Sequence, residues 1–97
     1  MIIYEFTTWG AKRGELFTVN NLKMVEKPRI YMGGGRRINK DDIGMLFTSF
    51  GHRMYLLDDN PEQYISAMIE YYENEVEKCQ NRLRQVKALL SKWQVAK

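Results

Sequence analysis

Apolar side chains recur at alternating spacings of four and three residues through the last third of the chain. They are Ile65, Ile69, Tyr72, Val76, Cys79, Leu83, Val86, Leu90 and Trp93, which we call the seam. The average spacing of about 3.5 residues is the repeat that winds helices around each other in a left-handed supercoil. The sequence offers no second long helix, so the pattern predicts a homo-oligomer, in its simplest form a dimer, packed through residues 65–93.

The predicted helix begins at a clear start signal. Asn60 is a capping residue, Pro61 suits the first helical position, and Glu62 lies near the positive end of the helix dipole. No Gly or Pro follows, so we expect the helix to continue to about residue 94, a length of roughly 50 Å.

A second apolar row lies outside the seam in the first half of this helix. Tyr64, Met68 and Tyr71 follow helical spacing and can pack on a sheet while the seam faces a partner. We therefore expect the first half to dock on the rest of the protein and the second half to project. The alternative is a helix that lies wholly on its own sheet, although four regular heptads exceed what such packing needs.

The first 57 residues are typical of a small β-rich head. Alternating apolar residues and Gly-rich turns predict strands at 2–9, 16–25, 29–32, 36–38 and 53–57. A short helix is expected to start at Asn39, with Ile43, Leu46 and Phe47 facing inward. The predicted fold class is α+β, a small and mostly antiparallel sheet of four or five strands with a short helix and a long C-terminal coiled-coil-like helix. Residues 1–57 and 58–97 are expected to form one domain.

Charges along the predicted helix are segregated. Residues 58–77 contain seven acidic and no basic side chains, and residues 78–97 contain six basic and no acidic ones. The helix dipole favours this order only near the two ends, whereas an antiparallel partner would lay each acidic half on a basic half. With Val76 beside the partner's Cys79, Glu75 faces the partner's Arg82. A parallel dimer would instead set Arg82 against the partner's Lys87, so we expect an antiparallel dimer.

Composition narrows the class of protein further. The net charge is +3, and the single cysteine and single histidine fall short of a disulfide framework or a zinc site. No apolar run approaches the ~20 residues of a membrane span, and the N-terminus lacks the pattern of a signal peptide. We expect a soluble, cytoplasmic protein without metal or cofactor.

The Gly-rich segment from Tyr31 to Arg37 is the sharpest candidate for binding chemistry. Its glycine backbone can approach an anion, and its two arginines can bind phosphate. If this turn meets the Gly-flanked turn at 10–14, with Trp9 and Tyr31 nearby, a basic aromatic patch suited to nucleic acid results. The candidate residues are Lys12, Arg13, Gly33, Gly34, Gly35, Arg36 and Arg37. The alternative is a hairpin turn with arginines in solvent.

Other reactive side chains have simpler interpretations. The acidic pairs at 41–42 and 58–59 precede predicted helix starts, where acids are common. His52 lacks an acidic or cysteine neighbour, which favours a surface or packing role. Cys79 occupies a seam position, where it can act as a small apolar side chain. We find no catalytic motif and expect no enzyme.

Three segments, VEKPRIY at 25–31, RINKDDI at 37–43 and YLLDDNP at 55–61, carry a resemblance. Over roughly residues 20–80 the chain resembles small uncharacterised proteins of Gram-positive phages and prophages. This resemblance transfers no activity, but it implies a phage context, in the host cell cytoplasm, where short proteins with basic heads are often accessory or host-directed factors. We therefore expect a non-enzymatic interaction module that binds a host or phage protein. The alternative is a protein that binds nucleic acid or nucleotide phosphate.

Overall fold

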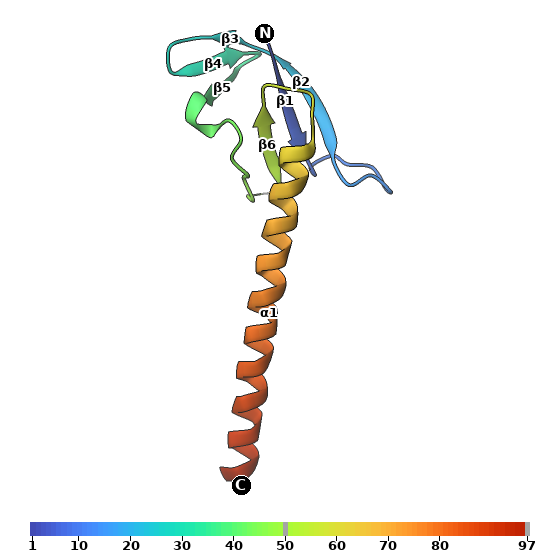
Figure 1. The fold of residues 1–97 in the computed structure, drawn as a ribbon, viewed down its shortest axis with the longest axis vertical. Helices are drawn as coiled ribbons and strands as arrows, with labels where there is room; N and C mark the ends of the chain where they lie inside the picture. Colours follow the sequence, from blue (N-terminus) through green and yellow to red (C-terminus); the bar gives the residue numbers. More distant parts are fainter. Residues whose placement is uncertain (50, 97) are drawn as a thin grey trace.

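A long helix projects from a small β-rich head (Figure 1). The computed structural model describes the backbone of residues 1–49 and 51–96 and the side chains of residues 1–49 and 51–93. The helix, α1 (Glu62–Ala96), contains 35 residues, and the molecule measures 67 × 33 × 22 Å. The architecture is α+β, as predicted.

The described part of the head contains two antiparallel sheets rather than one. Its strands are β1 (Ile2–Thr7), β2 (Thr18–Lys23), β3 (Val25–Glu26), β4 (Ile30–Gly33), β5 (Arg36–Asn39) and β6 (Arg53–Leu56). The first sheet has the order β2-β1-β6, and the second has the order β3-β4-β5. The prediction of a single sheet of four or five strands is therefore wrong. The chain leaves the first sheet at Met24, whose side chain is buried in the core, and β3 then begins the second sheet.

Alternation along β1 gives the first sheet two different faces. Phe6 lies opposite Met54 of β6, and both side chains are buried against α1. Ile3 and Glu5 point to the other face, where Ile3 packs with residues of the second sheet. The first sheet is thus covered by α1 on one side and, in part, by the second sheet on the other.

Each face of the first sheet has its own buried cluster. Phe6, Met54, Leu56 and Tyr64 form the cluster beneath α1. Ile3, Met24, Tyr31 and Ile38 form the cluster between the two sheets. A head this small depends on both clusters for its apolar burial.

The short helix predicted from Asn39 is present only as one 3₁₀ turn, Lys40–Asp42, with Asn39 at its N-cap position. The Asn39 side chain makes no cap hydrogen bond. Ile43 instead forms a bridge with Tyr55, and the backbone amide of Gly44 donates to the Tyr55 carbonyl over 2.9 Å. Gly44 has a φ of 82°, which a continuing right-handed helix cannot contain. Pairing with β6 therefore prevails over local helix propensity.

The start of α1 agrees with the sequence signal. The Asn60 side-chain oxygen accepts a hydrogen bond from the Glu62 amide over 3.0 Å, as an N-cap residue does. The Pro61 carbonyl accepts from the Ile65 amide over 2.8 Å, which places Pro61 in the first turn. The predicted start of the long helix is confirmed.

The first half of α1 docks on the head through the predicted second row. Tyr64 is fully buried, with its ring 5.8 Å from Phe6, and its hydroxyl donates to the His52 carbonyl over 3.2 Å. Burial raises the pKa of Tyr64 to about 12, so the phenol stays protonated as that donor. Met68 packs beside this cluster, and the Tyr71 ring lies 4.7 Å from the His52 ring. The expected division into a docked half and a projecting half is confirmed.

Deleting residues 77–97 is expected to leave the head folded, because the packing of α1 on the head lies between Tyr64 and Tyr72. Near-ultraviolet circular dichroism and a cooperative melting transition measure this. As a contrast, Tyr64→Ala in the full chain should destabilise the head by about 3–5 kcal/mol, since it removes a buried aromatic ring. An unfolded truncated chain would show that folding of the head requires the projecting helix.

Candidate functional site on the long helix

The seam of α1 is exposed along its whole length. The exposed fraction of its large apolar side chains runs from 41% at Ile65 to 63% at Trp93, and Cys79 is exposed as well. The exposure includes Ile65, Ile69 and Tyr72, which lie on the docked half of the helix. The head therefore packs mainly against another face of α1, and of the seam it contacts Tyr72, whose ring lies 5.3 Å from the His52 ring. Contiguous apolar stripes of this size on a protein surface mark interaction sites.

Shallow hollows separate successive side chains of the seam. One of about 310 Å³ is lined by Tyr72, Val76 and Leu83 among others. A second, of about 410 Å³, lies around Cys79 and Leu83, and a third, of about 520 Å³, lies between Val86 and Trp93. A coiled coil is built from side chains of one helix entering such hollows on the other. The three hollows are lined by residues of α1 alone and follow the seam along its projecting half.

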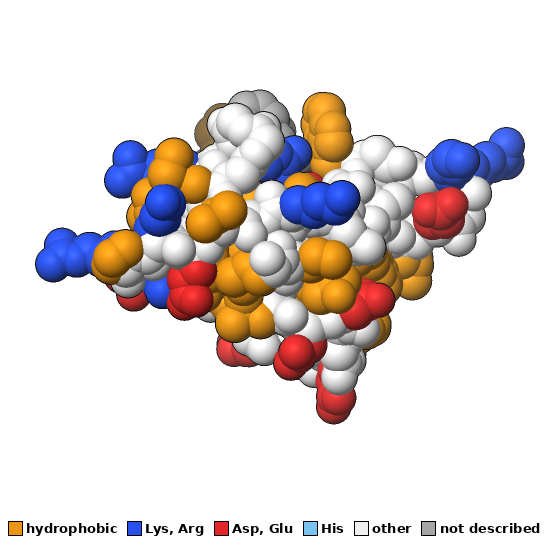
Figure 2. All heavy atoms as spheres, turned by 90° about the horizontal axis from the view of Figure 1, so that it is seen from above, with side chains coloured by type: hydrophobic (Ala, Val, Ile, Leu, Met, Phe, Trp, Pro, Cys, Tyr) orange, Lys and Arg blue, Asp and Glu red, His pale blue; other side chains and the backbone are white. Residues whose placement is uncertain are grey.

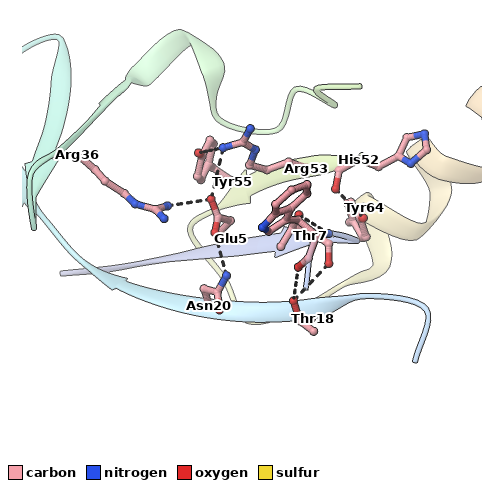
Figure 3. A network of polar contacts seen from close by, with 10 residues as sticks. Glu5, Thr7, Thr18, Asn20, Arg36, His52, Arg53, Tyr55 and Tyr64 are labelled. Carbon is pink, nitrogen blue, oxygen red and sulfur yellow. Dashed lines mark hydrogen bonds and ion pairs between the residues drawn. The ribbon is translucent and has the colours of Figure 1, made fainter. Parts of the chain in front are cut away.

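A polar cluster occupies the other face of the first sheet, around a buried carboxylate (Figure 3). Glu5 is 4% exposed and lies at the centre of β1. Its carboxylate accepts hydrogen bonds from the Asn20 side chain and from the Arg36 guanidinium, each over 2.9 Å. The Arg53 guanidinium lies 3.8 Å away. These residues line a depression of about 400 Å³ together with Trp9 and Thr7.

The partners of Glu5 keep it ionised despite its burial. Burial is the largest single influence on its pKa and acts to raise it. The hydrogen bond from Asn20, the charge and hydrogen bond of Arg36, and the Tyr55 hydroxyl act in the opposite direction. Together they hold the pKa of Glu5 below its ordinary value of 4.5. The cluster is a satisfied ion-pair network that ties β5 to the first sheet.

The Gly-rich turn is a tight connection between β4 and β5. Gly34 and Gly35 have φ values of 54° and 76°, which only glycine adopts readily. Gly33 lies so close to the backbone of Lys23 that a side chain could not fit there. This geometry is that of a hairpin turn, the alternative given by the sequence. The arginines were expected in solvent in that alternative, whereas Arg36 is paired with Glu5.

The structure places Lys12 and Arg13 apart from Arg36 and Arg37, which are neighbours in β5. Lys12 and Arg13 lie in the exposed loop that follows the end of β1, whereas Gly33 lies beside Lys23, which pairs with the start of β1. Tyr31 is buried between the two sheets and cannot stack on a base. Seen from the head end, Lys and Arg side chains are scattered across the view rather than gathered in one patch (Figure 2).

His52 and Cys79, the other reactive side chains considered from the sequence, lie in surroundings that suggest packing rather than catalysis. The His52 ring packs against Tyr71 and Tyr72, with centroids 4.7 and 5.3 Å apart. Cys79 is exposed on the seam. Among the described residues, no group of three or more histidine, cysteine or acidic side chains is arranged to hold a metal ion.

The role of Glu5 was not anticipated from the sequence. A signal did exist, because Glu5 alternates in phase with Ile3 on the strand that proved to be central. The phase alone could not identify its partners, since Arg36 lies 31 residues away and reaches Glu5 only through the second sheet.

Comparison with known proteins adds no family to this description: no family model, no curated protein and no solved structure matches the chain. Within the described residues, no helix combines the length and the apolar character needed to cross a membrane.

The Glu5 network is expected to make stability depend on pH. Because the folded-state pKa of Glu5 lies below 4.5, its ionised form stabilises the fold above that pH, and the contribution is lost as pH falls through the folded-state pKa. Glu5→Gln should lower the free energy of unfolding at pH 7 by about 1–2 kcal/mol and weaken its fall towards pH 3. Denaturant titrations between pH 3 and 7 measure both effects. Glu15→Gln, in an exposed loop, is the control, and equal pH dependence in the Glu5 variant and the wild type would contradict the assignment.

Proposed function

We propose that the protein is a non-enzymatic protein-interaction module that self-associates through α1. The observation that carries this proposal is the exposure of the seam, whose apolar side chains are at least 41% exposed although they follow a heptad pattern. Burying such a stripe against another helix removes apolar surface from water at every layer. The regular spacing favours a helix as the partner surface.

A second copy of the chain is the partner that the charges favour. The half of α1 near the head is acidic and the projecting half is basic, so two antiparallel copies place opposite charges side by side. Glu75 then faces the partner's Arg82. In the single chain Glu75 lies 3.5 Å from Lys78, but the Lys78 side chain is largely exposed and the Glu75 side chain partly so. Such pairs contribute little to stability, so Glu75 can exchange partners.

An antiparallel dimer would carry its two heads at opposite ends of the paired helices. Each head then presents its own surface, and a target with two sites would gain from bivalent attachment. The resemblance of residues 20–80 to small proteins of Gram-positive phages supports a phage-encoded accessory or host-directed factor, with a host or phage protein as the target. The pairing of Arg36 with Glu5 makes the basic Gly-rich turn a weaker candidate for phosphate binding than the seam is for self-association.

The first test is the mass of the protein in solution. Light scattering at micromolar concentration is expected to give at least twice 11.5 kDa. Leu83→Glu should dissociate the assembly, because it would bury an unpaired carboxylate in the seam. Ala88→Glu places the same charge on the opposite face of the helix and should leave the mass unchanged. A monomeric wild-type chain at high concentration would overturn the proposal.

The second test reports orientation. In an antiparallel dimer Cys79 lies beside the partner's Val76, so mild oxidation of the wild type should give little disulfide-linked dimer, while Val76→Cys should crosslink rapidly to the partner's Cys79. A parallel dimer would place the two Cys79 side chains in one layer. Rapid, near-complete crosslinking of the wild type would therefore reverse the assigned orientation.

A further inference from the structure

A pocket of about 590 Å³ lies where the end of β6 meets the start of α1. Leu56 and Ile43 form part of its apolar lining, and Leu57, which is 46% exposed, stands at its edge. Asp58 and Glu62 supply carboxylates, and the first turns of α1 complete the wall. The pocket therefore has a mixed lining, with apolar side chains from Ile43, Leu56 and Leu57 and polar or acidic ones from the start of α1 and the residues before it.

The register of the proposed dimer brings one defined part of the second copy to this pocket. The proposed dimer places Val76 beside the partner's Cys79. Because the helices are antiparallel, a residue seven positions earlier in one helix pairs with a residue seven positions later in the other. Ile65 then lies beside the partner's Leu90, and Glu62 lies at the level of the partner's Trp93. Glu62 and Ser66 line the pocket, so in this register the C-terminal end of the partner helix would lie at the level of the pocket.

The C-terminal end of α1 carries apolar and basic side chains that complement the leucines and acids of the pocket. Trp93 is 63% exposed in the single chain and carries a large apolar ring. The ring suits the leucine lining. The partner's Lys87 would come beside Ser66, which also lines the pocket and lies one turn from Glu62. Apolar character and charge agree.

We propose that this pocket is the docking site for the C-terminal end of a second copy's helix, with Trp93 as the anchor. The inference rests on the proposed self-association and assigns the head a part in it. Two-fold symmetry makes the contact twice per dimer. The contact also fixes the register, because a heptad pattern alone tolerates a slip of seven residues, and such a slip would remove Trp93 from the pocket.

The test uses the full chain with Trp9→Phe, which leaves Trp93 as the single tryptophan. Its emission should shift to shorter wavelength as the chain associates. Leu57→Arg in this background should raise the dissociation constant at least about tenfold, a change of 1.4 kcal/mol, and return the emission towards that of exposed tryptophan. Leu16→Arg, at a residue that is 83% exposed in the β1–β2 loop, is the matched control and should change neither.

A second variant guards against a misfolded head. Trp93→Ala lies on the projecting end of α1, and it should weaken the dimer about as much as Leu57→Arg does. The two changes combined should cost little more than either one, since both remove the same contact. Additive losses, or a dimer indifferent to Leu57→Arg, would overturn this inference and leave self-association standing. A wild-type chain that stays monomeric would overturn both.

Discussion

The structure depends on one constraint. The long helix carries two apolar stripes, and the head covers only one of them. The docked stripe centres on Tyr64, a fully buried side chain that joins α1 to the first sheet. The other stripe is the seam, and it stays exposed even at Ile65, one residue further along the helix. Within a single helical turn, one side of α1 therefore packs on the head and the other side is exposed. The exposed stripe is unfavourable in water and is the reason for proposing an assembly.

The head uses polar chemistry to connect its two sheets. Glu5 sits on the central strand, and Arg36 reaches it from the second sheet, so this ion pair bridges the two sheets. A buried carboxylate left without partners would destabilise the fold, and this need explains the pairing of Arg36 with Glu5. The same pairing removes one arginine from the basic patch expected at the Gly-rich turn.

The proposals for the seam and for the head pocket form one picture of assembly. In the proposed dimer the seam would supply apolar area, the segregated charges would favour the antiparallel arrangement, and the pocket beside Glu62 would receive the end of the partner helix. The heads of such a dimer would lie far apart, and each would keep its outer surface for another partner.

The sequence by itself determined the long helix, its start at Asn60 and the division between docked and projecting halves. Helical periodicity and capping act within a few residues, so they are readable from neighbouring positions. Most strands were also readable, since alternation is local as well. Self-association, orientation and function are still predictions, because they depend on a second molecule.

Three features of the head depend on contacts between residues far apart in the sequence, and only the tertiary structure revealed them. The head divides into two sheets because Met24 is drawn into the core between them. The helix expected from Asn39 gave way to pairing of Ile43 with Tyr55, a contact across twelve residues that local propensity could not reveal. The pairing of Glu5 with Arg36 likewise needed the fold. Long-range pairing decides these features because a short helix or an isolated charge has too little local free energy to resist it.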